Sequence, residues 1–133
     1  MSALLAHRTA VITGATQGIG RGIAERFLAA GAEVVVADLQ APPDMDAWSA
    51  ATEGRVRWVE TDVCSAASIA HLAASIRAAG QRLGVLVNNA GIMFEKHIDE
   101  QTEADWDRAM AVNLKGPFLM TKGLLGLLRD RCS

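Results

Sequence analysis

The stretch Thr13-Gly14-Ala15-Thr16-Gln17-Gly18-Ile19-Gly20 decides the fold, because it joins an apolar run to a helical pattern. Residues 10–12 before it are apolar, and residues 21–30 after it carry apolar side chains at helical spacing. This order of strand, glycine-rich turn and helix suits a nucleotide, since a pyrophosphate needs backbone N–H groups and a helix N-terminus directed at it. Glycine allows both the sharp turn and the close approach of a ligand to the backbone.

The glycine spacing, G-x-x-x-G-x-G, differs from the G-x-G-x-x-G of most dinucleotide folds, so the turn alone is weak evidence. Asp38 strengthens the prediction of a nucleotide site. It closes the next apolar run, at about the separation from the turn where the 2′-hydroxyl of a ribose requires an acceptor. The alternative, a plain tight turn between a strand and a helix, leaves Asp38 unexplained.

The rest of the chain alternates short apolar strands with amphipathic helices. The expected strands are residues 9–13, 33–38, 56–60 and 85–87. The expected helices are residues 21–30, 46–51, 66–79 and 102–129, the last interrupted at Gly116-Pro117. Ser65 and the box Thr102-Glu103-Ala104-Asp105 are predicted to cap two of them. This alternation predicts an α/β fold with a parallel sheet and helices on both faces.

Composition indicates one globular, soluble domain over residues 1–133. Half of the residues are apolar and the net charge is −2, without the basic stripe that nucleic acid or an anionic membrane would require. No apolar run approaches the length of a membrane span, and no signal-peptide pattern opens the chain. Cys64 and Cys132 lie far apart, which favours reduced thiols and a cytoplasmic protein. The histidines share no metal-ligand spacing, so we expect no metal.

Asn88-Asn89-Ala90-Gly91 follows the expected fourth strand. Ligands bind at the carboxyl ends of strands in open α/β sheets, so this small polar turn is a second candidate site element. Cys64 is expected to be a small packed residue and not a nucleophile, because no base is placed beside it. The tryptophans at positions 48, 58 and 106 are expected to be packing residues.

Four motifs, in order, resemble those of the short-chain dehydrogenase/reductase family. They are Thr13-Gly14-x-x-x-Gly18-Ile19-Gly20, Asp62-Val63, Asn88-Asn89-Ala90-Gly91 and Val112-Asn113-Leu114. The resemblance covers essentially the whole chain, which looks like the first half of such an enzyme. It implies a partial Rossmann-type, three-layer sheet of strand order 3-2-1-4. The implied activity is an NAD-dependent interconversion of an alcohol and a carbonyl.

The resemblance also implies which residues bind the cofactor. The glycine turn would hold the pyrophosphate, Asp38 the adenosine ribose, and Asp62-Val63 the adenine. The full set is Gly14, Thr16, Gln17, Gly18, Ile19, Gly20, Asp38, Leu39, Asp62, Val63, Asn89, Ala90 and Gly91. Gln17 and Leu39, where the family often places a basic residue for NADP, are neutral, and Asp38 would repel a 2′-phosphate. NAD is therefore expected to be preferred over NADP.

Asn113 is the position that matches the family's catalytic set. In the family, the backbone carbonyl of this asparagine holds a water of the proton relay. Pro117, four residues later, has no N–H to bond that carbonyl, which supports the role independently. The alternative is an asparagine without function on a kinked helix, and both interpretations predict the kink. The family's serine and Tyr-x-x-x-Lys pair would lie beyond Ser133, and the chain has no tyrosine.

Two interpretations of function stay open at this point. The chain represents the cofactor-binding half of an NAD-dependent oxidoreductase, with NAD(H) and a small alcohol or carbonyl compound as partners. Alternatively it is an inactive nucleotide-binding fragment, or an interaction module built on helix 102–129, which lies where the family makes dimer contacts. We expect no hydride transfer by this chain alone. We also expect self-association, through an exposed edge at strand 85–87 and the apolar face of the last helix.

Overall fold

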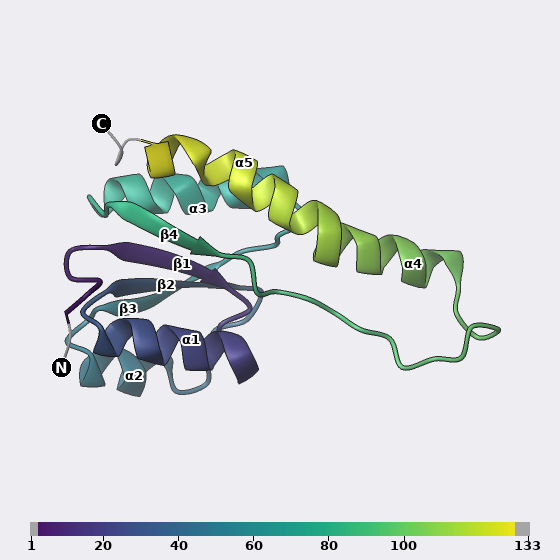
Figure 1. Cartoon of the computed structure of the whole chain (residues 1–133), viewed down its shortest axis with the longest axis horizontal. Coiled ribbons are helices and arrows are strands. Elements are labelled where there is room, and N and C mark those ends of the chain that lie inside the picture. Colours follow the sequence, from purple (N-terminus) through teal and green to yellow (C-terminus); the bar gives the residue numbers. More distant parts are fainter. Residues whose placement is uncertain (1–2, 130–133) are drawn as a thin grey trace.

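The computed structural model describes residues 3–129 as a parallel sheet with helices on both faces (Figure 1). The strands are β1 (Thr9–Thr13), β2 (Glu33–Asp38), β3 (Val56–Glu60) and β4 (Leu83–Val87). The helices are α1 (Gly18–Ala29), α2 (Met45–Ala51), α3 (Ala66–Ala78), α4 (Glu103–Met110), the π-helical turn η1 (Ala111–Lys115) and α5 (Gly116–Arg129). The four strands lie in the order β3-β2-β1-β4 with every neighbouring pair parallel, which confirms the predicted fold class and strand order.

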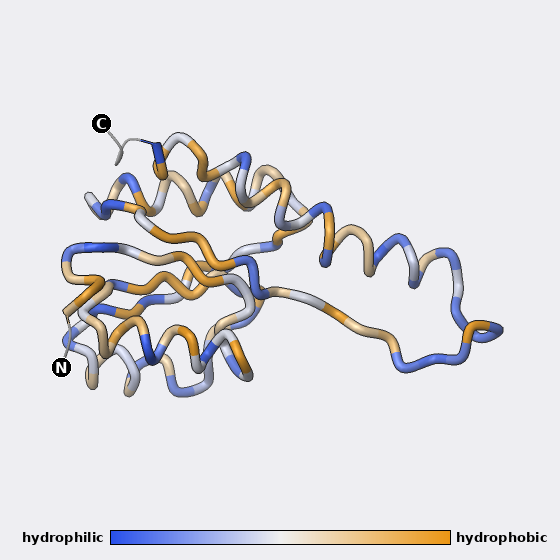
Figure 2. Tube along the Cα trace, viewed as in Figure 1, coloured by the Kyte–Doolittle hydropathy of each residue, from blue (hydrophilic) through white to orange (hydrophobic). Residues whose placement is uncertain are grey.

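Two hydrophobic cores lie on opposite faces of the sheet. On β2, Val34 and Val36 pack with α1 and α2, whereas Val35 packs with α3 and α5. Successive side chains of a strand point to opposite faces, so a strand covered on both sides needs an unbroken apolar run. This is why residues 33–38 show little alternation, and Figure 2 shows hydrophobic residues along the strands.

The predicted helix boundaries are mostly confirmed. Ser65 Oγ accepts a hydrogen bond from the Ser68 N–H at 3.1 Å and begins α3. Thr102 and Asp105 exchange the two hydrogen bonds of a capping box, each of 3.1 Å, at the start of α4. Gly31 follows the C-terminus of α1 with a φ of 94°, a conformation that favours glycine. Two elements begin earlier than predicted, α1 at Gly18 and β4 at Leu83.

The interruption of the last helix takes a form that the sequence did not predict. It is a π-helical turn, in which the Gly116 N–H donates to the Ala111 carbonyl five residues earlier. Pro117 then lies in the first turn of α5, where its missing N–H removes no bond within that helix. The deviation therefore comes just before Gly116-Pro117.

The connection from β4 to α4 extends away from the sheet, and α4 lies beyond the end of the strands (Figure 1). None of the eight residues that the structure describes in α4 is buried. Trp106 is 63% exposed, so the expectation that it is a packing residue is wrong, whereas Trp48 is 8% exposed. Within residues 3–129, no helix combines the length and apolar character needed to cross a bilayer.

Candidate functional site

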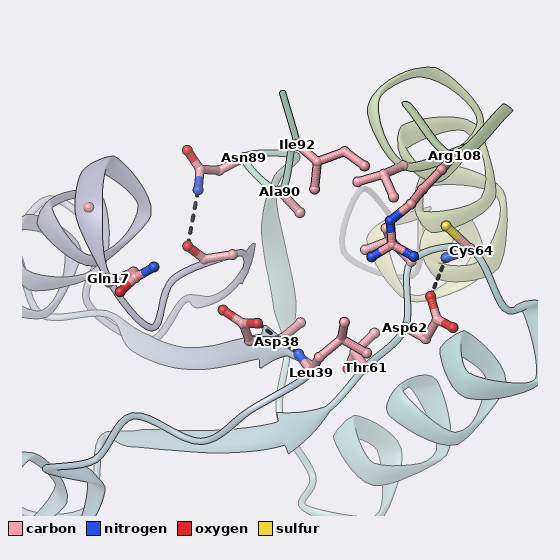
Figure 3. A pocket seen from close by; sticks show the side chains of 16 residues that line it. Gln17, Asp38, Leu39, Thr61, Asp62, Cys64, Asn89, Ala90, Ile92 and Arg108 are labelled. Atoms are coloured by element: carbon pink, nitrogen blue, oxygen red, sulfur yellow. Dashed lines mark hydrogen bonds between the residues drawn. The ribbon is translucent and has the colours of Figure 1, made fainter. Parts of the chain in front are cut away.

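A cavity of about 540 Å³ opens at the carboxyl ends of the strands (Figure 3). Its walls come from the glycine turn, the ends of β2 and β3, the segment after β4, and α4 with η1. Ten of the predicted positions line it: Gly14, Gln17, Gly18, Asp38, Leu39, Asp62, Val63, Asn89, Ala90 and Gly91. The other lining residues were not predicted: Ala37, Thr61, Cys64, Ile92, Arg108 and Val112. Segments far apart in the sequence thus converge on one cavity.

Four predicted site residues lie outside this cavity. Thr16 lines a neighbouring cavity of about 350 Å³ together with Gln17, Asp38 and Leu39. Ile19 is 78% exposed. Gly20 lies behind the turn, and the side chain of Asn113 contacts the segment after β4. Of these four residues, Gly20 packs closely beside Asn89 and Asn113 bonds to Ile92, and both of those neighbours line the cavity.

The glycine turn leaves room where a ligand would approach it. Gly18 has a φ of 65°, and a Cβ atom added there would meet nothing within 4 Å. Gly20 is the opposite case, because an added Cβ would lie 2.5 Å from Asn89 Nδ2 and 2.6 Å from the Gly14 carbonyl oxygen. Glycine is therefore required at position 20 by close packing. At position 18 it favours the turn and leaves the N-terminus of α1 open.

Thr13 and Asn89 join the ends of β1 and β4. The buried Thr13 Oγ1 accepts hydrogen bonds from the backbone N–H groups of Asn89 and Ala90 at 3.0 and 2.9 Å. Asn89 Nδ2 donates to the Gly14 carbonyl at 3.2 Å. The two segments that line the cavity on either side of this junction are therefore held in register by side chains.

The carboxylate of Asp38 is oriented by the backbone. Its Oδ1 accepts from the Leu39 N–H at 2.7 Å and its Oδ2 from the Thr16 N–H at 3.3 Å. Thr16 Oγ1 also donates to the Gln40 carbonyl at 2.9 Å, which ties the loop after β2 to the glycine turn. A carboxylate accepts about four hydrogen bonds, so Asp38 keeps capacity for a ligand hydroxyl.

Asp62 and Cys64 lie at the far end of the cavity from Gln17 (Figure 3). Asp62 Oδ1 accepts from the Cys64 N–H at 2.9 Å, and the Asp62 N–H donates to Ser68 Oγ at 2.9 Å. Cys64 is exposed, so the prediction that it is packed is wrong. Partial desolvation raises the pKa of its thiol and the Asp62 carboxylate raises it further, which leaves a weak nucleophile at neutral pH. Cys132 lies outside the described residues.

Asn113 holds the segment after β4 against η1. Its Nδ2 donates to the Ile92 carbonyl at 2.7 Å, and its Oδ1 accepts from the Ile92 N–H at 2.8 Å. The side chain thus pairs with Ile92 as a neighbouring strand would, a role that the sequence analysis missed. The predicted water site at the Asn113 backbone carbonyl stays a prediction.

Arg108 is the main lining residue that the sequence analysis missed. It lies four residues before Val112, so the two side chains occupy one face of the continuous helix formed by α4, η1 and α5. That spacing was the available signal, because Val112 belongs to the last of the four motifs. Among residues 3–129, no group of three or more His, Cys, Asp or Glu side chains lies close enough to hold a metal ion.

The sequence model of the short chain dehydrogenase family matches residues 8–133. An uncharacterised oxidoreductase of Mycobacterium bovis is 38% identical over 98% of this chain and 53% of its own length. Galactitol 2-dehydrogenase of Agrobacterium fabrum is 35% identical over 96% of this chain and 49% of its own length. The crystal structure of a short-chain dehydrogenase/reductase from Brucella melitensis matches with a TM-score of 0.85 and 36% identity, covering 96% of this chain and 54% of that one.

The chain spans about half the length of the curated relatives that it matches. The family's sequence model nevertheless covers almost all of the chain, and the sheet order agrees with it. The chain belongs to the short-chain dehydrogenase family.

Proposed function

We propose that the chain forms the NAD-binding part of an oxidoreductase that interconverts an alcohol and a carbonyl compound. The observation that carries this proposal is the order of groups along one cavity. An open glycine turn at the N-terminus of α1 lies at one end, the oriented Asp38 carboxylate in the middle, and Asp62 at the other end (Figure 3). Phosphate, ribose and base follow in the same order along a nucleotide.

The residues present fit the adenosine half of a dinucleotide. The turn at Gly18 would bind the pyrophosphate, because its backbone is open and the helix dipole favours negative charge. Asp38 would accept from ribose hydroxyls, and Asp62 with Val63 would border the adenine. When bound, NAD would take a hydride from the alcohol, and NADH would return it to the carbonyl.

Charge in the cavities supports NAD over NADP. Asp38 lies where a 2′-phosphate would come close, and like charges there oppose binding. Among the described residues that line the smaller neighbouring cavity, none is a lysine or an arginine. The lining consists of Thr16, Gln17, Asp38, Leu39, Gln40, Ala41 and Pro43. We therefore expect NADH to bind at least about tenfold more tightly than NADPH.

Calorimetric titration of the chain with NADH and with NADPH tests this proposal. Micromolar to millimolar binding of NADH with the expected preference would support it. Absence of NADH binding by the folded chain would overturn the proposed function, whereas equal affinities would overturn the cofactor preference alone.

We propose that this chain of 133 residues binds the cofactor but does not by itself catalyse hydride transfer. Proton transfer to or from the substrate oxygen needs a positioned acid or base, which contributes about 10²–10⁴ in rate. The family's proton donor is a tyrosine, and the 133 residues contain none.

The names of relatives such as galactitol 2-dehydrogenase support a hydroxyl compound as the substrate of the whole protein. We also propose a cytoplasmic location, because the free thiol of Cys64 suits a reducing compartment.

We also propose that the chain self-associates. β4 is at the edge of the sheet. On the continuous helix formed by α4, η1 and α5, the side chains of Trp106, Leu114 and Phe118 are between 61% and 68% exposed. An open strand edge and an uncovered apolar surface both favour association. Sedimentation velocity at micromolar concentration should show dimers or larger species, and a single monomeric boundary would refute this.

A further inference from the structure

We propose that Arg108 binds the adenine base of the cofactor by laying its guanidinium plane against the ring. This inference rests on the proposed function, because it requires NAD to bind in the 540 Å³ cavity. It adds a cofactor-binding residue from α4, a helix that none of the four sequence motifs includes.

The position of Arg108 indicates the base and not the phosphates. Figure 3 shows its side chain entering the cavity beside Cys64 and Asp62, at the end opposite Gln17, with Asp38 between. The N-terminus of α1, where a pyrophosphate is favoured, lies at the Gln17 end. A nucleotide whose ribose meets Asp38 therefore brings its base toward Arg108.

Arg108 is free to take a ligand. It is exposed, and within residues 3–129 it forms neither an ion pair nor a side-chain hydrogen bond. Other arginines are committed to the fold: Arg21 binds Asp44 through two hydrogen bonds of 2.9 and 2.8 Å, and Arg55 donates to two backbone carbonyls at 2.9 and 3.0 Å. Of the described residues that line the cavity, Arg108 alone is cationic.

The chemistry around Arg108 matches adenine. A planar guanidinium stacks well on an aromatic face, and the attraction grows where water is excluded. Ile92, Val63 and Val112 also line the cavity and provide apolar surface for the ring. Asp62 uses Oδ1 to accept from Cys64, and a carboxylate has further capacity to accept from the exocyclic amine of adenine. The base would meet a cationic plane, apolar walls and an anionic edge.

Binding of ADP-ribose and NADH to four proteins tests the proposal: the parent chain, Arg108→Met, Arg108→Lys and Lys115→Met. We expect Arg108→Met to weaken both ligands about five- to thirtyfold. Arg108→Lys should recover only part of this, because it keeps the charge and loses the plane. Lys115→Met removes the same charge two turns further along the helix, from a residue that does not line this cavity, and should cost less than about twofold. Thermal unfolding should be unchanged in all, since these side chains are exposed.

Each other outcome has a definite meaning. Parent-like binding by Arg108→Met overturns the inference and leaves the proposed function standing. Full recovery in Arg108→Lys, or an equal loss in Lys115→Met, shows that charge alone acts and overturns the stacking. Absence of binding by the parent overturns the proposed function and this inference together.

A direct readout is the NMR signal of Arg108 in chain labelled with ¹³C-arginine, assigned by its loss in Arg108→Met. Stacking on adenine should shift the Arg108 Cδ protons upfield when ADP-ribose is added, through the ring current. Inorganic pyrophosphate should not reproduce this shift. A matching shift with pyrophosphate, or none with ADP-ribose, would overturn the assignment to the base.

Discussion

The cavity has two walls that are built in different ways. The turn wall comprises the glycine turn with the ends of β1 and β2, and it is fixed by strand pairing, by the buried Thr13 and by the tight fit at Gly20. The helix wall comprises Gly91, Ile92 and α4 with η1. It continues into α5, whose Met120 and Leu124 are buried in the core. It is joined to the segment after β4 by the Asn113 pair to Ile92 and by an ion pair of 2.9 Å between Lys96 and Asp105. Backbone packing fixes the first wall along its length, whereas the second is anchored in the core at its α5 end and is joined to the segment after β4 by polar side chains. Damage to the turn wall should therefore abolish binding, whereas damage to the helix wall should tune it.

The largest expected effect comes from Gly20→Ala in the turn wall. The added methyl group would lie within 2.6 Å of both Asn89 Nδ2 and the Gly14 carbonyl oxygen, so the turn must shift. We expect a loss of about 1–3 kcal/mol in the free energy of unfolding and loss of measurable NADH binding. Urea denaturation and calorimetry measure the two effects.

Gly22→Ala is the matched control for Gly20→Ala. Gly22 lies in the same helix, and an added Cβ there meets nothing within 4 Å. Replacing a helical glycine by alanine should stabilise the chain by up to about 1 kcal/mol and leave NADH binding intact. Equal behaviour of the two variants would show that the turn wall is not tightly packed.

Asp38→Asn tests the charge of the turn wall without removing its shape. The single amide oxygen can still accept from the Leu39 N–H, whereas the longer bond of 3.3 Å from the Thr16 N–H is lost, and the side chain no longer repels a 2′-phosphate. We expect the ratio of NADH to NADPH affinity to fall by about tenfold, mainly through tighter NADPH binding. An unchanged ratio in parallel titrations would mean that Asp38 does not face the 2′ position.

Asn113→Ala should open the helix wall while the body of the domain stays folded. It removes both hydrogen bonds to Ile92, at a site exposed to solvent, for a cost of about 1 kcal/mol. Hydrogen exchange should accelerate at the Ile92 amide and remain slow in β1 and β2. Asn113→Asp keeps the acceptor for that amide and should protect it better than alanine does. Accelerated exchange throughout the sheet would contradict the separation of the two walls.

The sequence predicted the turn wall better than the helix wall, for a physical reason. Gly14, Gly18 and Asp38 act through backbone conformation and the position of strand ends, which short patterns encode. Arg108 faces the cavity only because η1 and the Asn113 pair set the direction of α4. The sequence predicted a break near Pro117 and not its π-helical form. Cys64 and Trp106 were expected to be packed, and both are exposed, because α4 and the segment after β3 have few neighbours.

The smallest expected effect is a pH-dependent loosening at the start of α4. The Lys96 ammonium group lowers the pKa of the Asp105 carboxyl from its usual 3.8, and the Thr102 N–H lowers it further. A pKa that is lower in the folded state means that the carboxylate stabilises the fold above its unfolded pKa. That contribution is lost as the pH falls through the lower, folded value.

Amide signals of residues 102–105, followed by NMR from pH 7 down through roughly pH 4 and below, should show this loosening before β1 changes. Asp105→Asn should be loosened already at pH 7 and respond less to acid, because its amide cannot form the ion pair with Lys96. Asp107→Asn, on the same helix and outside the capping box, is the control and should titrate as the parent does. If α4 and the sheet of the parent instead unfold together in acid, the start of α4 does not loosen separately from the sheet. The distinction between the two walls would then be wrong for the Lys96–Asp105 contact.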